Sequence, residues 1–159
     1  MDKNKAEKIA QKIVSTGVVK EIMCLDLAVK LIERVEDKAR QMGMKVVVAV
    51  SDAAGRPIAV HCMDGAYHGS FDVAVNKTYT STAFQMSTAK LAKLCKPGSE
   101  LYGLQFSNDG HVMILGGGEP LMIGEVMVGA LGVSGGSAAQ DSELAEYGRN
   151  IFKEVVKCL

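Results

Sequence analysis

The chain has 159 residues, a length that suits one domain with a sizeable hydrophobic core. Its 18 Lys and Arg residues balance 18 Asp and Glu residues, and this neutral charge argues against nucleic acid or an anionic membrane surface as the main partner. Four cysteines without a Cys-x-x-Cys pair, and no apolar run of membrane-spanning length, predict a cytoplasmic protein with reduced thiols.

Residues 3–18 predict a short amphipathic helix, with apolar residues on one face and charged residues over much of the rest. A helix this short is marginal in water unless it docks on a surface. That surface belongs to its own domain, to a sister subunit, or to another protein such as a shell or scaffold component. We therefore treat residues 1–20 as a docking or targeting segment and residues 21–159 as the domain.

Residues 22–42 predict a second, stronger amphipathic helix that ends at a glycine. The pattern then changes, because residues 45–51 are β-branched almost throughout and residues 56–63 read as the returning strand. The tight turn at residues 52–55 places Gly55 where a positive φ is needed. These features predict a β-hairpin.

Residues 70–84 predict a helix with Ser70 as its N-cap. Ser87 is expected to cap a further short helix that runs to Leu94. After an Asn-Asp-Gly turn, residues 111–115 predict a short strand.

The last part of the chain predicts two strands, 121–123 and 126–134, joined by a two-residue turn whose first residue is glycine. A helix over residues 137–157 follows, and Ser137 with Gln140 forms a capping box at its start. Together these elements predict an α+β domain in which helices cover a sheet of about five mainly antiparallel strands.

Gly116, Gly117 and Gly118 raise the question of a phosphate-binding loop. They are followed by Glu119, Pro120 and another strand, whereas a phosphate loop needs a lysine and a helix, and a dinucleotide fingerprint must open a helix. The glycine run is therefore not a phosphate loop of known type. It is either a wide turn or bulge, or a place where a ligand or a neighbouring chain approaches the backbone closely.

Gly135, Gly136 and Ser137 are the better anion candidate, because they end a strand and open a helix. Asp141 lies in the same first turn, and its carboxylate would repel a bound anion.

Polar side chains gather after the predicted hairpin. Asp64, Tyr67 and His68 lie on a loop, and His68 is either a general base, a metal ligand or a solvated histidine. Lys77 and Tyr79 follow on the next helix but are two residues apart, so they do not share a face. No complete catalytic set appears among these residues.

Four stretches in order, "VVAVSDAAGRPIAVHCMDGA", "NKTYTSTAF", "LYGLQFSNDGHVMILGGGEPL" and "GEVMVGALGVSGGSAAQDSELAE", resemble the GlcG/HbpS-like family. The resemblance covers roughly residues 24–157 and points to the branch formed by PduO C-terminal domains and their stand-alone relatives. It implies a profilin-like fold, with a five-stranded antiparallel sheet between helices. It also implies a homo-oligomer, from dimer to octamer, that binds haem or another tetrapyrrole.

The resemblance also suggests a setting in propanediol, glycerol or cobalamin metabolism, where residues 3–18 resemble helices that address enzymes to bacterial microcompartments. The motif positions that match imply a shared framework of pocket and interface: Asp64, Lys77, Tyr79, Gly116, Gly117, Gly118, Pro120, Gly132, Ser134, Gly135, Gly136 and Asp141. The haem-ligating histidine of the PduO branch lies on the helix before the first strand, and residues 22–42 contain none. Its role would pass to His61, His68 or His111, or to Cys24.

The leading hypothesis is a small haem- or tetrapyrrole-binding accessory protein, with a corrinoid as the alternative ligand. His68 is the expected metal ligand, Asp64, Lys77 and Tyr79 supply polar contacts, and the glycines at 116–118 with Ser134, Gly135 and Gly136 allow close approach. One alternative is an enzyme on a small carbonyl or hydroxy-acid metabolite, with Lys77 or His68 as base and backbone N–H groups as oxyanion donors. Another is a scaffold subunit addressed by residues 3–18.

Overall fold

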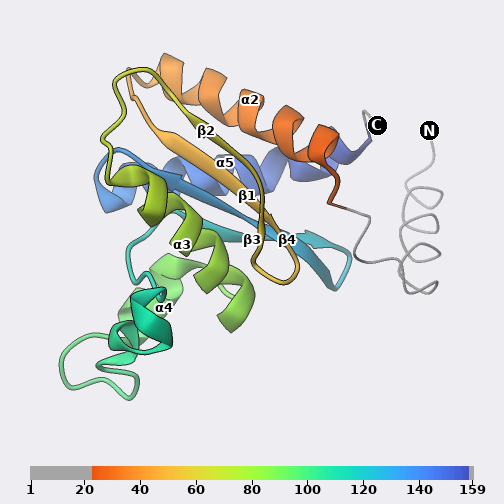
Figure 1. Cartoon of the computed structure of the whole chain (residues 1–159). Coiled ribbons are helices and arrows are strands. Elements are labelled where there is room, and N and C mark those ends of the chain that lie inside the picture. The colour runs from red at the N-terminus through yellow and green to blue at the C-terminus, as the bar shows by residue number, and fades with distance from the viewer. Residues whose placement is uncertain (1–22, 158–159) are drawn as a thin grey trace.

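A computed structural model describes residues 23–157 (Figure 1). The predicted helix over residues 3–18 lies outside this range, so its docking role stays a prediction, as does the domain boundary near residue 20. The described elements, in chain order, are α2 (Leu25–Gln41), β1 (Val47–Asp52), β2 (Pro57–Cys62), α3 (Ser70–Phe84), α4 (Thr88–Leu94), the 3-10 turns η2 (Leu104–Phe106) and η3 (Asn108–Gly110), β3 (Gly118–Ile123), β4 (Val126–Ser134) and α5 (Ala138–Val156).

The four strands form one antiparallel sheet in the order β2-β1-β4-β3. Helices α2 and α5 pack together on one face of the sheet, and α3 crosses the other face (Figure 1). The α+β architecture with helices on both faces is therefore confirmed. The name profilin-like stays a prediction.

Strand β1 carries the core on both of its faces because its residues alternate across the sheet. Val48 and Val50, with Val46 just before the strand, belong to the main hydrophobic cluster with α2 and α5, whereas Val47 and Ala49 pack toward α3. A strand buried on both faces needs the continuous β-branched run that the sequence shows there.

The predicted strand over residues 111–115 is wrong, and the described sheet has four strands rather than five. Asn108 and Asp109 have φ of 51° and 54°, which turns the chain out of an extended path. The Thr80 hydroxyl on α3 accepts from the Met113 amide at 2.8 Å, and its single proton is shared between the carbonyls of Asn76 at 2.7 Å and His111 at 3.3 Å. The Met113 amide is thus paired with a helix side chain rather than with a neighbouring strand.

The other local predictions are confirmed, with one correction. Gly55 has φ 77°, Gly124 has φ 60° in the β3–β4 turn, and Ser137 forms its capping box with Gln140. Ser70 is the first helical residue of α3 instead of its cap, and Gly69 precedes it with no side-chain cap bond. No helix within residues 23–157 is long and apolar enough to cross a membrane.

Candidate functional site

The motif residues lie in two separate regions. The first, which we call the lysine knot, is a buried polar cluster around Lys77 and Asp141. Lys77 on α3 is 1% exposed, and its Nζ donates to the Val133 carbonyl at 2.6 Å and to Asp141 Oδ2 at 2.8 Å. Burial lowers the pKa of Lys77, and the hydrogen bond and charge of Asp141 oppose that shift. The knot joins α3, β4 and α5 through one charged side chain.

The predicted glycine run packs against this knot. Gly116, Gly117 and Gly118 are buried, and Gly117 has φ 114°. A Cβ on Gly117 would lie 2.8 Å from Lys77 Nζ and 2.6 Å from the Val133 carbonyl oxygen, so only glycine fits there. The Gly118 amide donates to Thr88 Oγ1 at 2.9 Å. The sequence left open a wide turn or a close approach by a ligand or a neighbouring chain, and the structure shows a close approach of the chain to itself.

The predicted anion position at the start of α5 is occupied by the protein's own side chains. The Gly136 amide donates to Asp141 Oδ1 at 2.8 Å, and the Ser137 amide donates to Gln140 Oε1 at 3.0 Å. Ser134 is buried beside them at the end of β4. Asp141, which the sequence marked as a repulsive neighbour, instead supplies the anion.

Tyr79 lies apart from the knot and fastens the 108–111 turn to α3. Its hydroxyl accepts from Asn108 Nδ2 at 2.7 Å, and its ring meets the His111 ring edge-on at 5.9 Å. His111 Nδ1 also lies 3.2 Å from Asn76 Oδ1. The Tyr79 and His111 rings therefore help to hold the 108–111 turn against α3.

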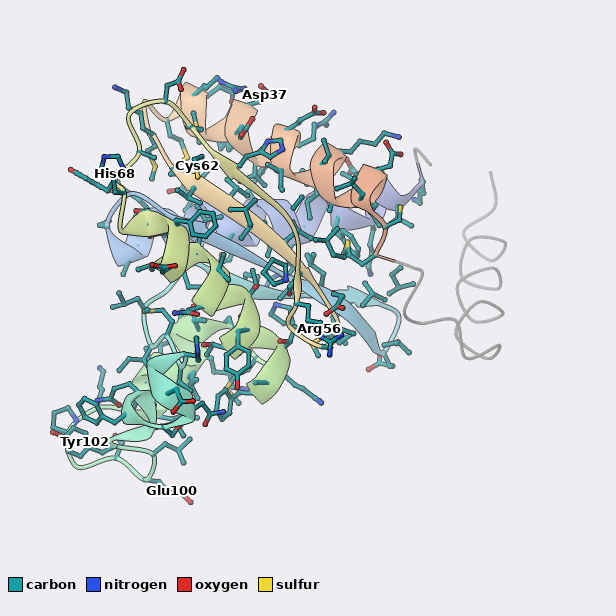
Figure 2. The ribbon with its side chains drawn as sticks, viewed as in Figure 1. Asp37, Arg56, Cys62, His68, Glu100 and Tyr102 are labelled. Carbon is teal, nitrogen blue, oxygen red and sulfur yellow. The ribbon has the colours of Figure 1, made fainter. Side chains whose placement is uncertain are left out.

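The second region, which we call the α2–β2 end, is where the end of α2, the start of β1, the end of β2 and the following loop meet. Figure 2 shows Cys62 and His68 at this end, with Arg56 at the opposite end of the hairpin. An open depression of about 520 Å³ lies here, and its lining combines charged and sulfur-containing side chains: Glu36, Arg40, Gly43, Met44, Lys45, Cys62, Met63 and Asp64. Of the predicted site residues, only Asp64 and His68 belong to this end.

Exposed aromatic rings flank His68. Tyr67 is 75% exposed, and Phe71, in the first turn of α3, is 45% exposed. His68 itself is exposed and makes no side-chain hydrogen bond or ion pair with residues 23–157. These three side chains are therefore accessible to solvent.

At the same end, a histidine pairs with a glutamate in a contact that the sequence analysis did not predict. His61 Nδ1 on β2 lies 3.1 Å from Glu36 Oε1 on α2. The sequence named His61 only as one alternative ligand and did not name Glu36, because their 25-residue separation hides the contact. The neighbouring Cys62 does not share this position, because His61 lies opposite Val48 and Cys62 lies opposite Val47, so the two side chains face opposite sides of the sheet.

Within residues 23–157, no three His, Cys, Asp or Glu side chains gather closely enough to hold a metal ion.

A family described as "Haem degrading protein HbpS-like" matches residues 23–150. The chain belongs to this HbpS-like family. The match spans the sheet, all four described helices except the end of α5, the lysine knot and the α2–β2 end. The family resemblance seen in the sequence is therefore confirmed.

Two relatives of this HbpS-like chain are similar along much of its length. A 15.0 kDa protein encoded between dhaT and dhaS in Citrobacter freundii is 37% identical over 131 residues, which cover 82% of this chain and 92% of that protein. The corrinoid adenosyltransferase PduO of Salmonella typhimurium is 36% identical over 110 residues, 69% of this chain. The chain spans only about a third of that adenosyltransferase (33%).

Two solved structures share the fold. The protein ORFY of Klebsiella pneumoniae has a TM-score of 0.80 at 34% identity, with 82% of this chain and 90% of that chain covered. A PduOC–haem complex has a TM-score of 0.73 at 33% identity, with 76% of this chain and 87% of that chain covered. The second of these is described as a complex with haem.

Proposed function

We propose that this HbpS-like protein is a haem-binding accessory protein. The observation that carries the proposal is the likeness to the PduOC–haem complex, which extends over 76% of the chain at 33% identity. The family description, which names haem, points the same way. A corrinoid remains the alternative tetrapyrrole, suggested by the adenosyltransferase relative.

The side chains at the α2–β2 end fit haem. His61, on the α2 face of the sheet, and His68, on the loop after β2, offer alternative imidazoles for the iron. The exposed rings of Tyr67 and Phe71, close to His68 in the chain, offer surface for a porphyrin. Lys45 lines the depression and makes no ion pair with the described residues, so its ammonium is available to a haem propionate. When bound, haem supplies a redox-active iron with open axial positions.

The predicted site residues then divide by role. His68 and Asp64 are proposed to contact the ligand. Lys77, the glycines at 116–118, and Ser134 with Gly135 and Gly136 are proposed to hold the scaffold, because they lie in or against the buried knot. Tyr79 is proposed to hold the 108–111 turn. No observation favours Lys77 as the base of an enzyme, since its amine is enclosed and ion-paired.

A titration of the full-length protein with haem, followed by visible absorption, tests the proposal. We expect a saturable Soret shift at one haem per chain or per pair of chains. His68→Ala tests the choice that the sequence made for the axial ligand. A spectrum that stays that of free haem over the whole titration, in parallel with a saturable response to a corrinoid, would assign the site to the alternative ligand.

The setting of this function is also a proposal. Relatives whose names contain dhaT, dhaS and PduO suggest a role beside diol breakdown, and the family resemblance suggests a homo-oligomer. Light scattering would give the oligomeric state. Deletion of residues 1–20 in cells would test whether they address the protein to a shell or scaffold, because loss of co-localisation is expected only if they do.

A further inference from the structure

Glu36 and His61 form a carboxylate–imidazole pair between two elements that are distant in sequence. The Nδ1–Oε1 distance is 3.1 Å, and the side chains are 12% and 35% exposed. The carboxylate is thus nearly enclosed, while about a third of the imidazole faces solvent. The Glu36 side of the pair is therefore shielded from solvent, and the His61 side is accessible to it.

The strand register explains why His61 faces α2. His61 lies opposite Val48, whose side chain belongs to the core cluster beneath α2 and α5. Cross-strand partners share one face of a sheet, so the imidazole also points to that face. Strand β2 is an edge strand of the sheet, and His61 meets Glu36 where α2 passes over this strand.

The carboxylate is itself held in place. Arg40 Nη2 lies 3.2 Å from Glu36 Oε2, so each carboxylate oxygen has its own partner. A fixed acceptor on Nδ1 favours the tautomer with the proton on that nitrogen, which leaves the lone pair of Nε2 directed away from Glu36. This is the arrangement that histidine ligands of metals commonly use.

Neither of the other two histidines has such a partner. His111 Nδ1 faces the neutral Asn76 amide, and its ring packs on Tyr79. His68 has no side-chain partner among the described residues, so nothing there fixes its ring or its tautomer.

We propose that His61 is the axial ligand of the haem iron through Nε2, and that Glu36 is its positioning residue. This inference rests on the proposed haem-binding function and names the ligand for it. Arg40 and Lys45 line the depression together with Glu36, and their cations are the groups that a propionate would bind. With its Nδ1 proton held by the carboxylate, the imidazole would be a stronger donor to iron, and haem bound there would be favoured in the ferric state.

The first experiment uses the protein without haem. ¹⁵N NMR of the histidine rings is expected to show His61 with the proton on Nδ1, and Glu36→Ala is expected to abolish this preference. His111→Ala is the matched control, because it removes a histidine outside the pair. A wild-type His61 with its proton on Nε2 would overturn the positioning role of Glu36, whether or not haem binds.

The second experiment uses the haem complex. His61→Ala is expected to weaken haem binding at least tenfold and to remove the iron–histidine stretching band of the ferrous complex. Added free imidazole is expected to restore the band, and His111→Ala is expected to keep it. Circular dichroism and thermal unfolding of each variant check that it remains folded.

The redox state of the bound haem tests the positioning role of Glu36 separately. With haem bound, Glu36→Gln is expected to raise the ferrous-to-ferric ratio at a fixed ambient potential at least tenfold, because a neutral acceptor donates less charge through His61. Glu36→Asp, which keeps the carboxylate, is expected to lie closer to wild type. A ratio unchanged in Glu36→Gln would contradict the positioning role.

The failures are distinguishable. If wild-type protein gives no saturable Soret shift, the proposed function fails, and the ring NMR still decides the pair. If wild type binds haem and His61→Ala keeps both its affinity and the iron–histidine band, the inference is overturned. If His68→Ala loses the band in that case, the sequence-based choice of His68 stands.

Discussion

Lys77 and Asp141 bring opposite charges into a part of the protein that water does not reach. A buried ion pair adds little stability compared with a well-packed apolar pair. Removing one partner, however, leaves the other charge buried without a counter-charge, which is strongly destabilising. The side chains are 1% and 5% exposed, so solvent screens neither of them appreciably. Each also bonds to backbone, at Val133 and Gly136 respectively.

We therefore predict that Lys77→Met lowers the free energy of unfolding by about 3–5 kcal/mol. Asp141 would remain buried beside an apolar side chain. The double variant Lys77→Met with Asp141→Asn is expected to recover part of this loss, because no unpaired charge is left. Urea denaturation measures the free energy of unfolding of both variants. A loss below about 1 kcal/mol in Lys77→Met would mean that water or another group compensates the Asp141 charge.

Gly117→Ala tests the approach of the glycine run to the knot. Its φ of 114° and the 2.6 Å separation from the Val133 oxygen oppose any Cβ. Gly98 is a matched control, since it has φ 82° and no atom within 4 Å of an added Cβ. Gly98→Ala is expected to cost about 1 kcal/mol for the backbone conformation alone. Gly117→Ala is expected to cost clearly more in the same denaturation experiment, and equal costs would show that the crowding is relieved.

At the scale of elements, an ion pair between Glu119 on the edge strand β3 and Arg149 on α5 joins these two elements. Glu119 is 3% exposed, and Arg149 Nη1 donates to its Oε2 at 2.8 Å. Burial raises the pKa of Glu119 above its ordinary value of 4.5, Glu146 adds to the shift, and Arg149 opposes it.

This shift gives a pH prediction with a definite sign. A raised pKa means that the folded protein binds the proton more tightly than the unfolded chain does, so stability falls as pH rises from about 4.5 through the folded pKa. Glu119→Gln, which does not titrate, is expected to remove this decline. Denaturation between pH 4 and pH 7 measures it. A wild-type stability that rises over this range, to the same extent in Glu119→Gln, would contradict the assignment to Glu119.

At the scale of the whole molecule, the hydrophobic residues divide into separate clusters. The main cluster lies under α2 and α5, and another, built on Leu91, Cys95 and Val112, lies in the part of the chain around α4. Figure 1 shows α4 and the segment after it extending away from the sheet, and Figure 2 places Tyr102 at the tip of that extension. Local opening there need not disturb the main core.

Cys95 reports on that opening. It is 3% exposed, and burial raises the pKa of its thiol, whereas Cys24 and Cys62 are exposed. We expect alkylation, followed by peptide mass spectrometry, to modify Cys24 and Cys62 first and Cys95 only slowly. Full unfolding in urea should equalise the three rates. Equal rates in native buffer would show that the α4 region opens independently of the sheet.

What the sequence determined by itself was local. The β-branched run of β1, the turn glycines at 55 and 124 and the capping box at Ser137 depend on residues a few positions apart, and each is confirmed. The ordered motifs also identified the family, which the comparison confirms.

Tertiary structure decided the rest. Residues 111–115 look like a strand, but the Met113 amide donates to Thr80 on α3 instead of to a neighbouring strand. The motif residues look like one site, but Lys77 and the glycines close a buried knot while His68 lies at the α2–β2 end. Glu36 and His61 meet across 25 residues because the sheet register and the crossing of α2 bring them together. Spacing along the chain encodes periodicity, whereas a contact between distant residues depends on how complete elements pack.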